Sequence, residues 1–165
     1  MDLQRRKQLI EKYKDGYRAV SAALEGASDA ELGAKPAPGK WSAREIVHHL
    51  ADSEMTSAIR LRLLIAEERA AIRPYDQEVF ARNLYYDRPI ENSLRAFQAA
   101  RASTGELLDL MSDADYAKEG THPEHPSYGV GRWLEVYADH AHKHADQITR
   151  ARQSAGSTPA HRAAR

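Results

Sequence analysis

Histidines gather in one stretch near the end of the sequence, VYADHAHKHADQI, which spans residues 136–148. His140 and His144 lie four positions apart, so on a helix their imidazoles stand one above the other on the same face. That spacing lets two ring nitrogens reach one metal ion. It is equally consistent with two core histidines that are hydrogen-bonded to neighbouring groups. His142 falls on the opposite face, beside Lys143, and is predicted to be solvated.

A second histidine pair, His48 and His49, lies in the stretch EIVHHLADSE and supplies the candidates for a third ligand. The apolar periodicity of this helix leaves both residues on the flank, so it separates them poorly. The neighbours favour His49, because its helical stripe carries small or polar side chains that would leave a hollow beside the ring, namely Ser53, Thr56, Ser57 and Arg60. A hollow lined by hydroxyl groups suits a binding site. The alternative is a polar helix edge that faces solvent.

The amino-acid composition makes these histidines the main candidates for metal ligands. The chain of 165 residues has 8 histidines and no cysteine, which excludes thiolate catalysis, disulfides and thiolate-rich zinc sites. Histidine, aspartate and glutamate are then the strong metal ligands that remain. A metal site in this chain is therefore expected to depend on its histidines.

The charge balance and hydropathy of the chain limit which binding partners and which cellular compartment we expect for the protein. Lysine plus arginine number 24 and aspartate plus glutamate also number 24, so no net field favours nucleic acid or an anionic membrane. The N-terminal stretch MDLQRRKQLIEKYK has no apolar signal region, and no run is long enough to span a membrane. We therefore expect a cytoplasmic protein with neither nucleic acid nor membrane as a partner.

Four long segments have the periodicity of helices with one buried face. They are predicted at about residues 2–25, 42–71, 89–111 and 133–148. Ser42 and Glu45 form a capping box at the start of the second segment, and Pro74 is expected to stop it. Gly16 interrupts the first helix at a cost of about 1 kcal/mol relative to alanine.

The connections between these segments are predicted to be short turns and loop. YDQEVFARNL reads as a helical turn capped by Asp76, and SDADY contains another cap. KEGTHPEHPSYGVG, residues 118–131, is rich in proline and glycine and is predicted to be loop, and no segment has the period-two pattern of a strand. These features predict an all-α protein, a four-helix bundle with short extra helical turns in its longer connections. One domain is expected over residues 1–154, followed by a disordered or frayed tail over 155–165.

Three stretches, taken in order and spacing, resemble one known family. KWSAREIVHHLADSE, then IRPYDQE, then HP ahead of VYADHAHKHADQI, are similar to the DinB/YfiT-like family of metal-dependent four-helix-bundle proteins, over residues 40 to 150 or so. The resemblance implies that the second and fourth helices supply three histidines to one divalent ion, commonly zinc or nickel. Matched motif to motif, those ligands are His49, His140 and His144. The surrounding pocket is expected to differ, because other residues stand where family members have further histidine or tryptophan, namely Asp139, Lys143 and Asp146.

The resemblance also implies a range of reactions. Some relatives transfer low-molecular-weight thiols to electrophiles or isomerise a substrate with a thiol cofactor, and others are called hydrolases. We therefore expect a divalent-metal-dependent enzyme whose three-histidine site activates a thiol or water for transfer to, or hydrolysis of, a small-molecule substrate. The alternative is a non-catalytic metal-binding or stress-response binding protein. A homodimer is the expected assembly.

Three acids lie near the predicted ligands in sequence, Asp52, Glu54 and Asp139, and they are expected to orient ligands or to pair with arginines. No general base is assigned. Arg60, three helical turns after His49, could receive a substrate carboxylate, but a salt bridge with an acid of the third long helix is favoured.

Two further groups have alternative roles. Tyr75 and Asp76 either shape the mouth of a pocket or cap a turn, and the cap is favoured. His122 and His125, in THPEHP, belong to the predicted loop and are expected to lie outside the metal site.

Overall fold

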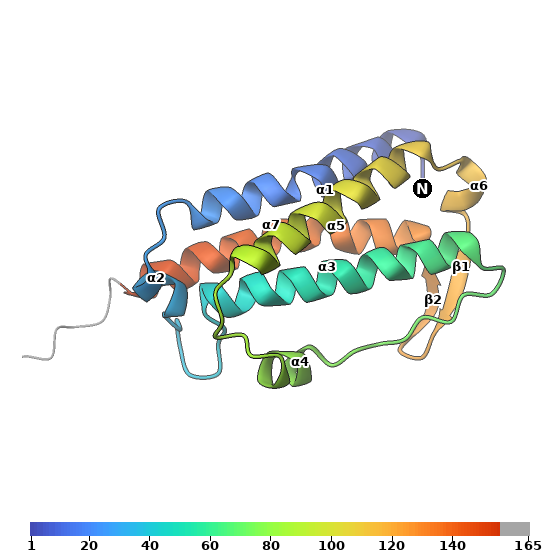
Figure 1. The fold of residues 1–165 in the computed structure, drawn as a ribbon. Helices are drawn as coiled ribbons and strands as arrows, with labels where there is room; N and C mark the ends of the chain where they lie inside the picture. The colour runs from blue at the N-terminus through green and yellow to red at the C-terminus, as the bar shows by residue number, and fades with distance from the viewer. Residues whose placement is uncertain (156–165) are drawn as a thin grey trace, which may run out of the picture.

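Four long helices form the body of the protein, of which the computed structural model describes residues 1–155 (Figure 1). Their bounds are Leu3–Leu24 for α1, Ala43–Ala66 for α3, Glu91–Leu110 for α5 and Val130–Ala155 for α7. Helices α1 and α3 each pack against both α5 and α7, which closes the four helices into a bundle. The predicted all-α four-helix bundle is confirmed. Of the predicted tail, 155–165, only Ala155 lies within the described residues, and it ends α7.

Three short helices occupy the connections of the bundle. Their bounds are Asp29–Gly33 for α2, Gln77–Asn83 for α4 and Asp113–Tyr116 for α6. The Asp76 carboxylate accepts hydrogen bonds from the backbone N–H groups of Glu78 and Val79, so Asp76 caps α4 as predicted. Ser28 and Ser112 each open a capping box at the other two short helices. The predicted helical turns in the connections are therefore present.

The predicted loop over 118–131 is wrong, because this segment folds into an antiparallel hairpin. Strand β1 spans Glu119–His122 and strand β2 spans His125–Gly129. The segment that follows α3 pairs with the hairpin: the Thr121 N–H donates to the Ala70 carbonyl oxygen at 2.8 Å, and the Ile72 N–H donates to the Thr121 carbonyl oxygen at 2.8 Å. These hydrogen bonds join residues about 50 positions apart, so a local reading of prolines and glycines misses them.

The same pairing explains why α3 ends at Ala66, earlier than predicted. After Ala66 the chain leaves the helix and runs extended past β1, well before Pro74. The approach is close, since a Cβ on Gly120 would lie 2.7 Å from the Ala70 carbonyl oxygen. Glycine at this position therefore lets the two backbones meet.

A buried ion pair ties the four long helices together at mid-length. Arg101 on α5 pairs with the Glu54 carboxylate on α3, which also accepts a hydrogen bond from the Tyr13 hydroxyl on α1. The Arg101 guanidinium further donates to the carbonyl oxygens of Tyr13 and Tyr137, each at 2.7 Å. Every charged atom of the pair has a partner, as a buried pair requires. The network holds Tyr137, and with it this part of α7, against the other three helices.

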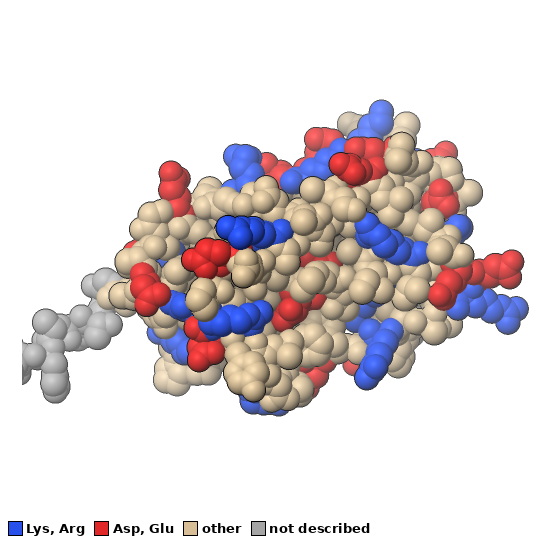
Figure 2. Space-filling model, viewed as in Figure 1, with Lys and Arg blue, Asp and Glu red and all other residues tan. Residues whose placement is uncertain are grey.

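Within residues 1–155, no helix has the length and apolar character needed to cross a membrane. Figure 2 shows acidic and basic side chains interspersed over the visible face. This distribution agrees with the equal numbers of acidic and basic residues in the chain.

Candidate metal centre

The three predicted histidines meet in the interior of the bundle. His49 comes from α3, whereas His140 and His144 come from successive turns of α7, which packs against α3. The His140 Nε2 atom lies 3.4 Å from His49 Nε2 and 3.2 Å from His144 Nε2. Ligand atoms of all three residues lie within 4.8 Å of one another. Helical spacing on α7 and the packing of α3 against it together produce this convergence.

The Nε2 atoms of the three histidines face the centre of this cluster. The His144 Nδ1–H donates to the Gln147 side-chain oxygen at 2.8 Å, so in the neutral ring the lone pair is on Nε2, toward His140. The Nδ1 atoms of His49 and His140 are buried and have no hydrogen-bond partner. The Trp41 ring covers His49, with ring centroids 4.9 Å apart. The Nε2 atoms thus point at one another, in a cluster where His49 is buried and His140 and His144 are partly buried.

These separations suit a divalent ion. A tetrahedral zinc with Zn–N bonds of about 2.0–2.1 Å holds neighbouring ligand nitrogens about 3.3 Å apart. The two Nε2 separations, 3.4 and 3.2 Å, bracket that value. The donor set of three imidazoles is one that zinc and nickel both accept.

Burial keeps the three histidines in the form that can bind a metal. Desolvation and the nearby His144 ring lower the pKa of His49 to about 3. The pKa of His140 is held well below its usual value by burial and by the two neighbouring histidines, and burial also lowers the pKa of His144. All three imidazoles are therefore neutral at neutral pH, with lone pairs available.

His48 and His142 face away from the cluster, but neither is simply solvated. The fully buried His48 donates from Nε2 to the Arg88 carbonyl oxygen at 2.9 Å, and its Nδ1 accepts from the Ser93 hydroxyl at 2.7 Å. His142 was predicted to be solvated; it is only half-exposed, and its Nε2 donates to the Lys12 carbonyl oxygen on α1 at 3.0 Å. Of the two adjacent histidines, His49 is the one that faces His140 and His144.

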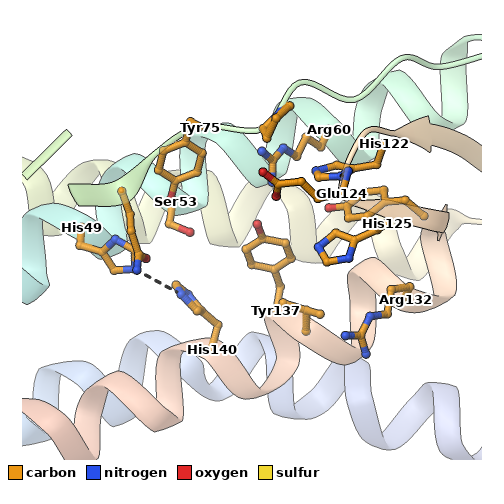
Figure 3. Close-up of a pocket in the computed structure, with 14 residues that line it drawn as sticks. His49, Ser53, Arg60, Tyr75, His122, Glu124, His125, Arg132, Tyr137 and His140 are labelled. Carbon is orange, nitrogen blue, oxygen red and sulfur yellow. Dashed lines mark hydrogen bonds between the residues drawn. The ribbon is translucent and has the colours of Figure 1, made fainter. Parts of the chain in front are cut away.

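A pocket of about 260 Å³ opens beside the histidines (Figure 3). His49 and His140 form one end of it, and the hairpin forms the other with His122, Glu124 and His125. Sequence reasoning placed His122 and His125 outside the metal site and missed this wall, together with Tyr137 and other lining residues, because the hairpin itself was not predicted. The run HPEHP, dense in titratable side chains, was the one available signal.

The three acids that were predicted near the ligands are engaged elsewhere. Asp52 accepts a hydrogen bond from the Tyr86 hydroxyl at 2.6 Å, and Glu54 pairs with Arg101. Asp139 pairs with Lys12, which lowers the pKa of that carboxyl. The expected pairing with cations thus holds for Glu54 and Asp139, although Asp139 pairs with a lysine. None of these acids is among the residues that line the pocket.

The favoured prediction for Arg60, a salt bridge with an acid of the third long helix, is wrong. Arg60 instead donates to the Arg73 carbonyl oxygen at 2.7 Å and lies over the Tyr75 ring. The acids of α5 lie out of its reach because Arg60 turns to the pocket side of α3, toward the segment that follows the helix (Figure 3). Tyr75 lines the pocket while Asp76 caps α4, so each of the two alternative roles is taken by one of these residues.

Comparisons with known proteins agree with this architecture. The family model described as the DinB superfamily matches residues 12–148. A protein of Oceanobacillus iheyensis named "Putative metal-dependent hydrolase" is 34% identical over 140 residues, 85% of this chain and 81% of that one. "Putative metal-dependent hydrolase YfiT" of Bacillus subtilis is 32% identical over 133 residues, 79% of this chain and 74% of that one.

The fold is matched by a solved structure as well. YfiT from Bacillus subtilis, described as a probable metal-dependent hydrolase with an unusual four-helix bundle topology, superimposes with a TM-score of 0.87 at 28% identity, covering 94% of this chain and 90% of that one. The matched residues include all three convergent histidines. The chain belongs to the DinB superfamily.

Proposed function

We propose that this protein is a divalent-metal-dependent enzyme in which His49, His140 and His144 hold one zinc or nickel ion. The observation that carries the proposal is the convergence of three neutral imidazoles, one buried and two partly buried, at Nε2 separations of 3.2 and 3.4 Å. Without an ion, the three converging Nε2 atoms would have only one another as hydrogen-bond partners among the described residues, which leaves lone pairs unsatisfied. The names of the relatives as metal-dependent hydrolases support the same conclusion.

A bound ion would supply a Lewis acid that makes hydroxide, or a thiolate from a thiol, available near neutral pH. The chain's own residues orient and enclose the site. Gln147 holds the His144 ring in one tautomer, and Trp41 shields the His49 ring from solvent. Tyr137 lies edge-on against His140 and also lines the pocket, so it connects the histidines to the space where a substrate would bind.

The reaction that we propose is hydrolysis of a small molecule, or transfer of a low-molecular-weight thiol to one. The pocket of about 260 Å³ accommodates a small substrate. An ion held by His49, His140 and His144 would suit both reactions, because each needs a water or a thiol whose pKa is lowered by coordination. The relatives' names favour hydrolysis.

A non-catalytic metal-binding protein is the second candidate. It is favoured by the engagement of Asp52, Glu54 and Asp139 in other contacts, which leaves none of these three carboxylates free to act as a general base. Glu124, exposed on the hairpin, is the carboxylate that lines the pocket. Turnover of a thiol plus an electrophile, or of an ester or amide panel, distinguishes the two candidates.

The metal is tested by elemental analysis of the purified protein. We expect close to one divalent ion per chain and a rise in melting temperature when zinc or nickel is added back to dialysed protein, because an ion that binds the native state alone stabilises it. Magnesium is the matched control, since it prefers oxygen ligands. A dialysed protein that neither rebinds zinc or nickel nor changes its melting temperature would contradict the proposal.

A further inference from the structure

Arg60 is a buried cation that lacks an anionic partner. It is 9% exposed, and its Nε–H has no hydrogen-bond acceptor. Among the described residues, no aspartate or glutamate oxygen forms a salt bridge with it, and its side chain donates hydrogen bonds to neutral oxygens, those of the Arg73 carbonyl and the Tyr128 hydroxyl. The other buried arginine, Arg101, has Glu54 as counter-charge. Burying an unpaired charge lowers the stability of the folded protein, so the unpaired Arg60 guanidinium needs a physical explanation.

The position of Arg60 supplies that reason, because it lies at the opposite end of the pocket from the histidines. Arg60 follows His49 by three turns of α3, about 16 Å along the helix axis. Side chains on a helix lean toward its N-terminus, which brings the guanidinium back toward His49. Both residues line the same pocket, and Figure 3 shows Arg60 reaching into the space between Tyr75, Tyr137 and His122.

Two other charged side chains line the pocket, and Figure 3 draws that of Glu124 beside Arg60, although no salt bridge joins the two. Glu124 and Arg132 are exposed, and the Arg132 guanidinium lies 3.9 Å from Glu135. His122 and His125 stack near Tyr128 on the hairpin. The pocket therefore combines a buried arginine with hydroxyl groups, and among the described residues no carboxylate forms a salt bridge with that arginine.

We propose that the pocket binds a small molecule through a carboxylate, and that Arg60 is the residue that holds this carboxylate. A planar guanidinium matches a carboxylate in shape and charge and can donate two parallel hydrogen bonds to it. A single buried cation balances one negative charge, which favours a carboxylate over a phosphate dianion. The inference rests on the proposed function in one respect, because it places the reacting bond of the substrate at the histidine end while the carboxylate is anchored at Arg60.

The test is a binding experiment on the full chain, with benzoate as the probe and benzamide as its neutral counterpart. Nitrogen–proton NMR follows the Arg60 Nε–H signal, which is assigned from its absence in Arg60→Lys. We expect millimolar benzoate to shift this signal, as suits a fragment of that size, whereas benzamide leaves it in place. Arg60→Gln should weaken benzoate binding about 10- to 100-fold, the range expected for losing a hydrogen bond to a charged group.

Arg62→Gln is the matched control. Arg62 is on the same helix, but its guanidinium is held by the Ala58 carbonyl and by Ser103 and Thr104, outside the pocket. We expect this variant to bind benzoate like the wild type. Arg60→Lys, which keeps the charge and the packing of the stem, should retain part of the affinity and serves if Arg60→Gln does not fold.

The titration is run both on metal-loaded and on metal-free protein, so that it reports on Arg60 separately from the histidines. Binding that persists without metal and depends on Arg60 supports the inference even if the metal proposal fails. Binding that needs the metal and ignores Arg60→Gln means that the carboxylate coordinates the ion, which overturns it. Three other outcomes also overturn the inference. Benzamide binds as tightly as benzoate, benzoate leaves the Arg60 Nε–H signal in place, or inorganic phosphate shifts that signal and benzoate does not.

Discussion

Two adjacent histidines, identical in chemistry, have opposite surroundings. The His48 ring is fully hydrogen-bonded to Ser93 and Arg88, whereas the His49 ring has an unpartnered Nδ1 and faces the two histidines of α7. A one-residue step along a helix turns a side chain by more than a quarter of a turn, so these two positions cannot both face the cluster. The pair therefore offers an internal control for the proposed metal site.

Replacing His49, His140 or His144 by alanine is expected to remove a metal ligand and strongly reduce the metal content measured by elemental analysis. His48→Ala should keep its metal but unfold at a lower temperature, because the buried ring makes two hydrogen bonds, to the Ser93 hydroxyl and the Arg88 carbonyl oxygen, whose loss costs about 1–3 kcal/mol.

His142→Ala removes one half-exposed hydrogen bond and should retain the metal with a smaller loss of stability, about 0.5–1.5 kcal/mol. If His48→Ala loses the ion while His49→Ala keeps it, the assignment on α3 is off by one residue.

At the scale of the elements, α1 and α7 approach each other closely at Gly16. A Cβ at this position would lie 2.7 Å from the Ala141 Cβ and 2.8 Å from the Arg101 Nε. Glycine in a helix interior costs about 1 kcal/mol relative to alanine, and here the close approach offsets that cost. Gly16 thus gives Arg101 the room to reach the Tyr13 carbonyl and Glu54.

Gly16→Ala is expected to destabilise the protein by about 1–3 kcal/mol, the usual cost of overpacking a core, despite the gain in helix propensity. Urea unfolding followed by circular dichroism measures the change. Gly105→Ala on α5 is the matched control, because its Cβ would meet only the flexible Lys14 side chain, at 3.2 Å. That variant should be as stable as the wild type or more so. Unchanged stability of Gly16→Ala would contradict this prediction, and would show that Arg101 can move away from the new methyl group without weakening its ion pair with Glu54.

At the scale of the whole molecule, the buried histidines couple folding to pH. The pKa of His49 is about 3 in the folded protein and near the ordinary value of about 6.5 when unfolded. A depressed pKa means that the unfolded state takes up protons first as pH falls. The stability associated with the neutral ring is fully present above about pH 6.5 and is lost progressively as the pH falls toward about 3.

Metal-free protein should therefore lose unfolding free energy between about pH 7 and pH 5, by up to about 1.4 kcal/mol per pH unit for each histidine that stays neutral in the folded state. Urea titrations at a series of pH values measure the slope. His49→Gln should show a shallower slope than the wild type, because it lacks one of the titrating groups. A wild-type stability that does not change over this range would contradict the expected linkage.

Local spacing in the sequence determined the helices and the His140 and His144 pair, since both depend on residues three or four positions apart. The capping of α4 by Asp76 could be predicted for the same reason, because a cap involves its nearest neighbours. The choice of His49 came from its small and polar neighbours and from the family resemblance, and the tertiary packing of α3 on α7 brought it to the other two histidines.

Only the tertiary structure decided which residues line the pocket. The hairpin depends on hydrogen bonds between Thr121 and the segment around Ala70, and no periodicity within either stretch encodes that pairing. The residue that contacts Arg60 could not be predicted from the sequence either. The helical phase gives the direction in which a side chain points, but not which residue of another element it meets. Contacts between residues distant in the chain are set by the packing of whole elements, which is why the histidine pair on α7 could be predicted and the wall of the pocket could not.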